Sequence, residues 1–136
     1  METIVIRPQI YSFNIDSGQH VSNIAYIQWM EIARIELLNQ VGMPLHEIDR
    51  QGFAPVLTHT EISYKKPLYL GDQVKVELWL SKLANISARM AFRIYRDEDE
   101  LVAEASQEGL FFSLTDKRPY KLSPEQKARF ARFAQP

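Results

Sequence analysis

The spacing of apolar residues along the chain predicts one long helix followed by a series of strands. From about Val21 or Asn23 to Val41, apolar residues occupy most of the helical circumference rather than a single stripe. A helix of this kind is usually covered by other elements on more than one side. Ser22 and Asn23 are candidate N-caps for this helix, and Gly42 suits the first residue beyond its end.

Alternation with a period of two dominates the later part of the chain and predicts strands. Between residues 74 and 81, Val, Val, Leu and Leu alternate with Lys, Glu, Trp and Ser, as in a strand with one buried face. A short helix is expected at 45–51, and a last helix after Ser123, which fits a capping box with Gln126 around Pro124. Turn residues delimit the expected strands, which cover residues 3–11, 53–69, 74–81, 86–96 and 101–115.

The order of the expected elements defines the fold class. One strand precedes the long helix, and four strands joined by short turns follow it, so neighbouring strands should run antiparallel. Such a sheet needs cover on one face, and only the long helix is large enough to provide it. We therefore expect a single α+β domain over residues 1–136, with an antiparallel sheet of five to six strands wrapped around a central helix. Pro8 indicates that the first strand is an edge strand, and Gly109 marks a bulge in the last.

Composition excludes several classes of function. The chain has 136 residues, a formal net charge of −1 and no cysteine. A charge near zero gives no basic field for nucleic acid, and the lack of cysteine excludes disulfides, thiolate metal sites and cysteine nucleophiles. The first residues lack the basic start and apolar core of a signal peptide, and no apolar run reaches the ~20 residues of a membrane span. We expect a soluble, cytoplasmic protein.

Candidate chemistry is concentrated directly before the long helix, where Asp16, Gly18 and His20 follow one another closely. A carboxylate can activate water or attack a carbonyl, and unpaired amides at a helix start can bind the resulting oxyanion. Gly18 permits a close approach to the backbone, and His20 can either move protons or orient the loop. A solvated or capping role for Asp16 remains an alternative on the residues alone. The candidate oxyanion donors are the backbone N–H groups of Val21, Ser22 and Asn23.

Other polar residues are weaker candidates. Glu31 and Arg34, three residues apart in an apolar helix, suit a structural ion pair better than a second catalytic acid. His59 and Glu61 form an ambiguous pair. The histidines lack the spacing of metal ligands, so we expect no metal site. Basic residues near turns suit either a solvated surface or the phosphates of a carrier such as coenzyme A: Lys65, Lys66, Lys82, Arg89, Lys117, Arg118 and Lys121.

Short motifs extend from residue 16 almost to the C-terminus. The entry to the long helix is DSGQHVSN at 16–23, followed by AY at 25–26 and EIAR at 31–34. Later motifs are ISYKKP at 62–67, LGD at 70–72, LVAEA at 101–105 and RPYKLS at 118–123. Together they resemble the 4-hydroxybenzoyl-CoA thioesterase-like branch of the hotdog-fold superfamily. Two positions depart from the family pattern, since Asn14 replaces an aspartate and Ser22 replaces the first residue of an Asn-Asn pair.

The resemblance implies a hotdog-fold acyl-CoA thioesterase that assembles as a homodimer or homotetramer, with its sites at a subunit interface. Asp16 matches the family's catalytic aspartate, which acts as nucleophile or general base. Asn23 matches the helix position whose backbone N–H polarises the thioester carbonyl. The expected substrate is an acyl-CoA, with an acyl-carrier-protein thioester as the alternative, and no cofactor is expected. The candidate catalytic residues are Asp16, His20 and Asn23, and the candidate substrate-binding residues are Val21, Ser22, Ile24, Ile27, His59, Ser63 and Lys65.

Two other functions remain open at this point. A hotdog hydratase or dehydratase would use Asp16 and His20 in acid–base work on a double bond, although its loop usually carries Asn-Pro where this chain has Ser-Gly-Gln. A non-catalytic module would bind an acyl thioester without cleaving it. For hydrolysis, we expect the acyl group to lie in an apolar slot between subunits, with Ile24, Ile27 and Phe53 as candidate lining residues.

Overall fold

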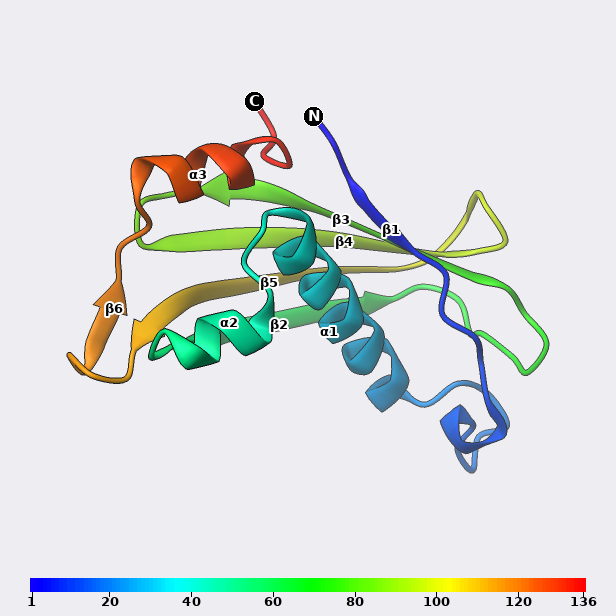
Figure 1. The fold of residues 1–136 in the computed structure, drawn as a ribbon. Coiled ribbons are helices and arrows are strands. Elements are labelled where there is room, and N and C mark those ends of the chain that lie inside the picture. Colours follow the sequence, from blue (N-terminus) through cyan, green and yellow to red (C-terminus); the bar gives the residue numbers. More distant parts are fainter.

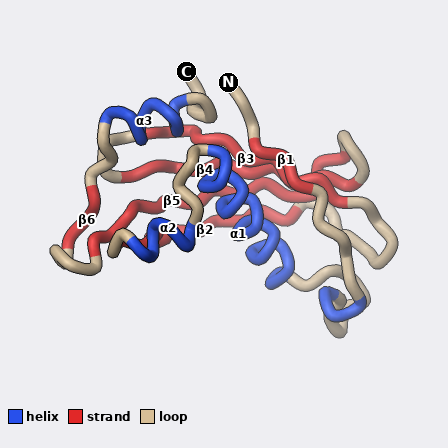
Figure 2. Tube along the Cα trace, in the orientation of Figure 1, coloured by secondary structure: helices blue, strands red, loops and turns tan.

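The computed structural model describes residues 1–136 and contains one antiparallel sheet with helices on one of its faces (Figure 1). Figure 2 shows the longest helix, α1, crossing in front of the strands, which confirms the predicted two-layer α+β arrangement. The elements in chain order are β1 (Ile4–Ile6), a 3-10 turn (Ser12–Asn14), α1 (Asn23–Gln40), α2 (Leu45–Arg50), β2 (Phe53–Tyr64), β3 (Val74–Leu83), β4 (Ser87–Arg96), β5 (Glu100–Ser113), β6 (Arg118–Tyr120) and α3 (Pro124–Ala131).

The sheet has the strand order β1-β3-β4-β5-β2, and the short β6 pairs with the end of β5. All pairs are antiparallel, as predicted. β1 lies at one edge, which confirms the position indicated by Pro8. β2 lies at the opposite edge, and most of its side chains are exposed. Its outer backbone groups are therefore available for pairing with another chain.

α1 packs against the sheet with one side and leaves a second apolar side uncovered. Trp29, Met30 and Leu37 belong to the core and are at most 3% exposed. Ile24 and Ile27, in contrast, are 67% and 46% exposed. The sequence predicts cover on more than one side, but no element of this chain packs over these two isoleucines.

Both ends of α1 have the predicted local signals. Ser22 is the N-cap, and its Oγ accepts the N–H of Ile24 at 3.2 Å. At the other end, Gly42 has a φ of +73°, and the N–H of Met43 donates to the Leu38 carbonyl at 2.9 Å. This pattern is a Schellman closure, in which a left-handed residue lets the chain satisfy the last helical carbonyls.

The ends of several strands differ from the prediction, because pairing with residues far away in the sequence determines where these strands begin and end. The first strand was expected over 3–11, but only Ile4–Ile6 pair with β3. β2 ends at Tyr64 rather than at 69, because the N–H groups of Lys65 and Lys66 both turn to the Val102 carbonyl. The residues after β5, which include the basic residues Lys117, Arg118 and Lys121 expected near a turn, contain the short strand β6, which pairs with the end of β5.

The bulge predicted in β5 lies instead in β2. The register of the β2–β5 pair shifts at Thr58, which is the extra residue, and Gly109 of β5 lies opposite this shift. A Cβ atom on Gly109 would lie 3.1 Å from the Val56 carbonyl oxygen. The glycine is therefore required because the bulged strand comes close to it, and not because β5 is bulged at Gly109; the irregularity of β5 lies at Val102, in its pairing with β4.

The last helix begins as predicted. Ser123 Oγ accepts the N–H of Gln126 at 3.1 Å, and Gln126 Oε1 accepts the N–H of Ser123 at 2.9 Å, with Pro124 as the first helical residue. This capping box directs Phe130 and Phe133 into the core, where both are buried. None of the helices has the length and apolar character needed to cross a membrane.

Candidate active site

The loop before α1 is a short closed turn. Ile15 and Val21 form an isolated antiparallel bridge. Inside this bridge the N–H of Asp16 donates to the His20 carbonyl at 3.1 Å, and the N–H of Gln19 donates to the Asp16 carbonyl at 3.0 Å. Gln19 has a φ of +68°, a left-handed conformation that closes the turn. These contacts fix Asp16 inside the turn, directly after Ile15, and α1 begins two residues after Val21.

The Asp16 carboxylate is held at one oxygen and free at the other. Its Oδ1 accepts the N–H of Gly18 at 2.8 Å, while its Oδ2 has no hydrogen-bond partner in the chain, and the residue is exposed. A carboxylate fixed in this way has restricted rotation but keeps one oxygen available. That oxygen can accept a proton from water or attack a carbonyl carbon.

Gly18 lies between the side chains of Asp16 and His20. A Cβ atom placed on Gly18 would lie 3.1 Å from Asp16 Oδ1 and 3.0 Å from His20 Nε2. The loop's own side chains therefore crowd Gly18, and the predicted close approach of a substrate to its backbone stays a prediction. The residue with the left-handed backbone is Gln19 instead. Glycine is needed here because both polar groups occupy the space that a side chain would fill.

His20 is half-buried and its ring is oriented by the backbone. Its Nδ1 lies 3.3 Å from the Val21 carbonyl oxygen. A carbonyl can only accept, so this contact assigns the proton of the neutral ring to Nδ1. Nε2 then carries the lone pair on the side that faces Gly18, where it can exchange a proton with a bound molecule. The side chains of Asp16 and His20 make no hydrogen bond or ion pair with each other.

Only one of the three expected amide donors is free. The N–H of Val21 donates to the Leu68 carbonyl, and the N–H of Ser22 donates to the Asn14 carbonyl, both at 2.8 Å. The prediction that these two N–H groups are free is therefore wrong. Their acceptors are backbone carbonyls that only the folded chain brings close. Asn23 is the first residue of α1, and its N–H has no acceptor in the chain. Its position at the positive end of the helix dipole favours an anionic oxygen.

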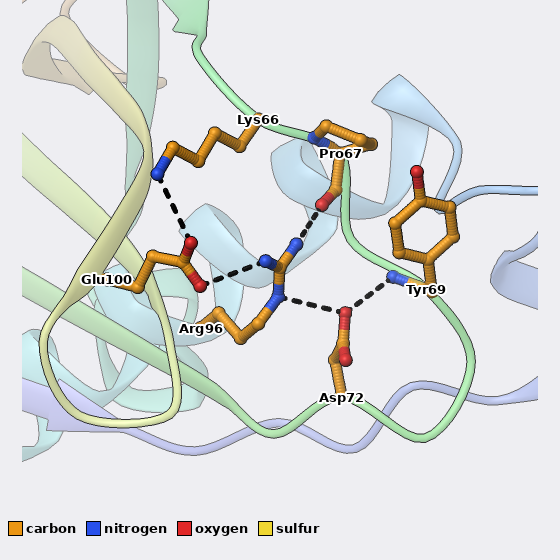
Figure 3. A network of polar contacts seen from close by, with 6 residues as sticks. All are labelled: Lys66, Pro67, Tyr69, Asp72, Arg96 and Glu100. Atoms are coloured by element: carbon orange, nitrogen blue, oxygen red, sulfur yellow. Dashed lines mark hydrogen bonds and ion pairs between the residues drawn. The ribbon is translucent and has the colours of Figure 1, made fainter.

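The carbonyl that receives the Val21 N–H belongs to a loop held by Arg96 (Figure 3). The Arg96 guanidinium pairs with Asp72 at 3.1 Å and with Glu100 at 2.9 Å, and it also donates to the Pro67 carbonyl. Burial lowers the pKa of Arg96, but Asp72 and Glu100 outweigh it, so the net shift is upward. The cation therefore stays charged and fixes the loop against which the entry to α1 is hydrogen-bonded.

Two neighbouring side chains complete this network. Lys66 pairs with Glu100 at 3.2 Å, and the hydrogen bond from this lysine is the main cause of a lowered Glu100 pKa. Asp72 Oδ2 accepts the N–H of Tyr69 at 2.8 Å, as Figure 3 shows. Leu68 lies between these anchors and is fully buried. The position of its carbonyl, and hence of the α1 entry, depends on both anchors.

Three candidate substrate-binding residues lie on the sheet face that points away from α1. Side chains alternate along β2, and Thr60 and Tyr64 face the helix. His59 and Ser63 therefore face outward, and His59 lies 3.6 Å from Glu61. Lys65 pairs with Glu104 at 3.6 Å on the same outer face. Within one chain these residues do not converge with Asp16.

A cavity of about 200 Å³ opens between the second half of α1 and the sheet. Fifteen of its twenty lining residues are hydrophobic, and its only charged lining residues are Glu31 and Arg34. Ile24, Ile27 and Phe53 were expected to line the acyl slot, but none of them lines this cavity. Phe53 is in the core instead, where it stacks on Tyr120 at 4.3 Å between ring centroids.

Sequence reasoning missed this cavity because its lining comes from seven helices and strands. The available signal was Glu31 and Arg34, two charged residues in a largely apolar helix; the ion pair expected between them is not formed. Glu31 is eight residues beyond Asn23, so the two are about 12 Å apart along the helix at ~1.5 Å per residue. No group of three or more His, Asp or Glu side chains lies close enough together to hold a metal ion.

An antiparallel sheet around one long helix, with an acid in a tight loop at the helix entry, defines a hotdog-fold protein of the thioester hydrolase type. The sequence profile of the Thioesterase-like superfamily matches residues 13–130, which is most of the chain. The chain therefore belongs to the Thioesterase-like superfamily. This finding confirms the predicted family and enzyme class.

Individual relatives agree with this assignment. The chain is 32% identical over 100 residues to a "Putative esterase" of Aquifex aeolicus, covering 74% of this chain and 76% of the relative. It is 27% identical over 103 residues to the "Putative acyl-CoA thioesterase YneP" of Bacillus subtilis, covering 76% and 72% of the two chains. The structure of a DHNA-CoA thioesterase from Staphylococcus aureus superimposes with a TM-score of 0.89 at 20% identity, covering 97% of this chain and 91% of that one. At this identity the superposition confirms the hotdog fold alone.

Proposed function

We propose that the chain hydrolyses an acyl-CoA thioester with Asp16 as its catalytic carboxylate and the Asn23 amide as its oxyanion donor. The observation that carries this proposal is the pairing of a fixed carboxylate, free at Oδ2, with an unpaired N–H at the start of α1. A thioester carbonyl held by this amide is polarised before any attack. One donor of this kind typically contributes ~3–4 kcal/mol to transition-state stabilisation.

The reaction needs a nucleophile and a proton for the leaving thiolate. Asp16 Oδ2 either removes a proton from water, whose oxygen attacks the carbonyl carbon, or attacks that carbon itself. The carbonyl oxygen takes the negative charge beside the Asn23 N–H. In the first route, the proton that Asp16 takes from water passes by way of the lone pair of His20 Nε2, which faces the same space, to the thiolate sulfur as the carbon–sulfur bond breaks. In the second route, the thiolate leaves and takes its proton from solvent water, and a water molecule then hydrolyses the acyl–Asp16 anhydride and frees the carboxylate. No metal or cofactor is required for these steps.

The proposal includes a homodimer or homotetramer. β2 is an edge strand of twelve residues with free backbone groups, and Ile24 and Ile27 on α1 are uncovered. A second copy that pairs along β2 would extend the sheet and cover these isoleucines. Such an assembly would place the acyl slot at the interface. Three candidate substrate-binding residues lie on the sheet face that points away from α1: His59, Ser63 and Lys65. They contribute to binding only if the assembly places the Asp16 loop of another subunit against that face.

Coenzyme A is proposed as the carrier because one relative is named a putative acyl-CoA thioesterase. An acyl-carrier-protein thioester is the alternative carrier. Competition between saturated acyl-CoA esters and the matching acyl-carrier-protein esters, followed by free-thiol release, distinguishes the two.

Replacement of Asp16 is the direct test of this function. Asp16→Asn keeps the size of the side chain but removes its charge, so we expect kcat to fall about 1,000-fold for acyl-CoA hydrolysis, equivalent to ~4 kcal/mol. Thiol release from saturated acyl-CoA esters measures the activity, and circular dichroism with size-exclusion chromatography verifies fold and assembly. Asp49→Asn in α2, which is also exposed, is the matched control. Unchanged turnover in a folded Asp16→Asn protein would contradict the assignment, and binding without thiol release in the wild type would favour a non-catalytic module.

A further inference from the structure

Arg34 differs from the other arginines of the chain. Three arginines make no ion pair, namely Arg34, Arg50 and Arg118, and only Arg34 among them is partly buried. Burial lowers the pKa of Arg34, and the charge of Glu31 acts in the opposite direction. Removing a guanidinium from water without an ion pair is unfavourable. The chain nevertheless keeps this cation at the wall of its largely apolar cavity.

One nitrogen of Arg34 is firmly anchored. Nη1 donates to Gln107 Oε1 at 2.6 Å, and Gln107 Nε2 donates in turn to Thr60 Oγ1 at 3.2 Å. Gln107 is completely buried at the centre of the sheet. Because Thr60 takes the amide N–H, the Gln107 oxygen is fixed toward the arginine. This chain of contacts holds the guanidinium in one place.

The remaining donors of Arg34 have no acceptor in the protein. A guanidinium carries five N–H donors, and Gln107 is the only partner that Arg34 has. No buried side-chain nitrogen of the chain lacks a partner, so the free donors of Arg34 reach an accessible surface. Arg34 is itself part of the cavity wall. A molecule in the cavity therefore meets fixed N–H donors.

The cavity has the size and charge for a neutral oxygenated group. An apolar cavity of ~150 Å³ binds benzene, and this one has about 200 Å³. Glu31 also lines the cavity, so its negative charge balances that of Arg34. A carboxylate on the ligand would be repelled by Glu31. A hydroxyl or carbonyl oxygen can accept from Arg34 without that repulsion.

We propose that Arg34 determines acyl specificity by donating a hydrogen bond to a neutral oxygen, a hydroxyl or carbonyl, on the acyl group of the substrate. This inference rests on the proposed function, because it takes the acyl slot at the proposed β2 interface to open into this cavity, which Pro55, Val56 and Leu57 of β2 line. The apolar walls bind the hydrocarbon part, and Arg34 selects the acyl groups that carry oxygen at the right carbon. Arg34 takes no part in the chemical step.

The test compares dodecanoyl-CoA with monohydroxydodecanoyl-CoA and mono-oxododecanoyl-CoA esters in which the oxygen is moved one carbon at a time, because a long acyl chain is needed to extend from Asn23 to the cavity. Arg34→Met removes the donors with little change in length. We expect it to lower kcat/KM for the best oxygenated ester by about 10- to 100-fold relative to dodecanoyl-CoA, as expected for a lost hydrogen bond to a charged group. Arg34→Lys keeps the charge without the planar fork and should have an intermediate ratio.

Controls separate specificity from folding. Arg34→Met leaves the Gln107 oxygen unpaired, so its thermal unfolding is measured beside its activity, and Arg34→Lys provides a second variant if the first unfolds. Arg50→Met changes an unpaired but exposed arginine and should leave the ratio of the esters unchanged. If the Arg34 variants leave the ratio of kcat/KM between the oxygenated and the unsubstituted ester unchanged, the inference is overturned, although the proposed hydrolysis is not. A wild-type preference for dodecanedioyl-CoA, which ends in a carboxylate, would also overturn it. Failure of the wild type to cleave any ester would instead remove the proposed function, and this inference with it.

Discussion

The two ends of α1 differ in how their surroundings are built. At the amino end, Asp16, Gly18 and His20 come from one short loop whose shape is set by backbone hydrogen bonds. At the carboxyl end, a largely apolar cavity is lined by side chains from three helices and four strands. The first region contains the reactive groups, and the second contains an apolar cavity of defined shape and the fixed Arg34. Substitutions in the cavity should therefore change which substrate is used, and substitutions in the loop should change how fast any substrate reacts.

Gly18→Val should have the largest effect among the remaining tests of this contrast. The added side chain meets Asp16 Oδ1 and His20 Nε2 at about 3 Å, so both groups must move. A displacement of ~1 Å at reacting groups typically costs ~100-fold in rate, and we expect such a loss of kcat for every acyl ester. Steady-state kinetics over a panel of chain lengths measures it. Loss for some esters but not others would show that the loop also selects substrates.

Ala88→Leu should act in the opposite way. Ala88 of β4 lines the cavity, so a larger side chain there reduces the space for the acyl group. We expect kcat/KM to fall about 10-fold for the longest accepted ester and to stay near the wild-type value for acetyl-CoA, since one methylene in an apolar pocket is worth ~1–3 kcal/mol. Ala91→Leu, on the outer face of the same strand, is the matched control. An equal loss for all esters would contradict the separation of the two regions.

Arg96→Met tests whether the loop at the amino end depends on its distant support. The variant loses the contacts to Asp72, Glu100 and the Pro67 carbonyl, so the Leu68 carbonyl that receives the Val21 N–H becomes less fixed. We expect kcat to fall about fivefold with little change in KM, because a small misplacement of the helix entry affects the transition state more than binding.

Arg7→Met is the control for Arg96→Met. Arg7 also forms a forked contact with a glutamate of the β4–β5 hairpin, Glu98, but it does not contact the loop of Leu68. The kcat of the Arg7→Met variant should remain at the wild-type value. Equal kinetics for the Arg7 and Arg96 variants would mean that the network stabilises the hairpin only.

Ser22→Ala should have the smallest effect. It removes the cap of the Ile24 N–H but leaves the Asn23 amide and the Asp16 loop in place. We expect about 1 kcal/mol of lost stability and a change in kcat of less than about twofold. Chemical denaturation measures the first and thiol release the second. A large loss of turnover would mean that the Ser22 hydroxyl takes part in the reaction.

The contrast between the two regions also explains what could be predicted from the sequence. The helix boundaries and the capping box at Ser123 depend on neighbours in the chain, and both were predicted. The engagement of the Val21 amide by Leu68, 47 residues away along the sequence, could not be predicted, because only the fold brings the two together. The cavity and the true strand of the bulge depend on long-range pairing for the same reason.

The left-handed backbone of Gln19 lowers the stability of the folded chain, and the shape of the loop requires it. A non-glycine residue in the left-handed region costs roughly 1–2 kcal/mol, and the surrounding bridge and hydrogen bonds maintain it. A glycine at this position would relax that tension and make the folded chain harder to denature. It would also make the loop more flexible and the Asp16 carboxylate less fixed. A substitution that raises stability at this residue would therefore lower activity.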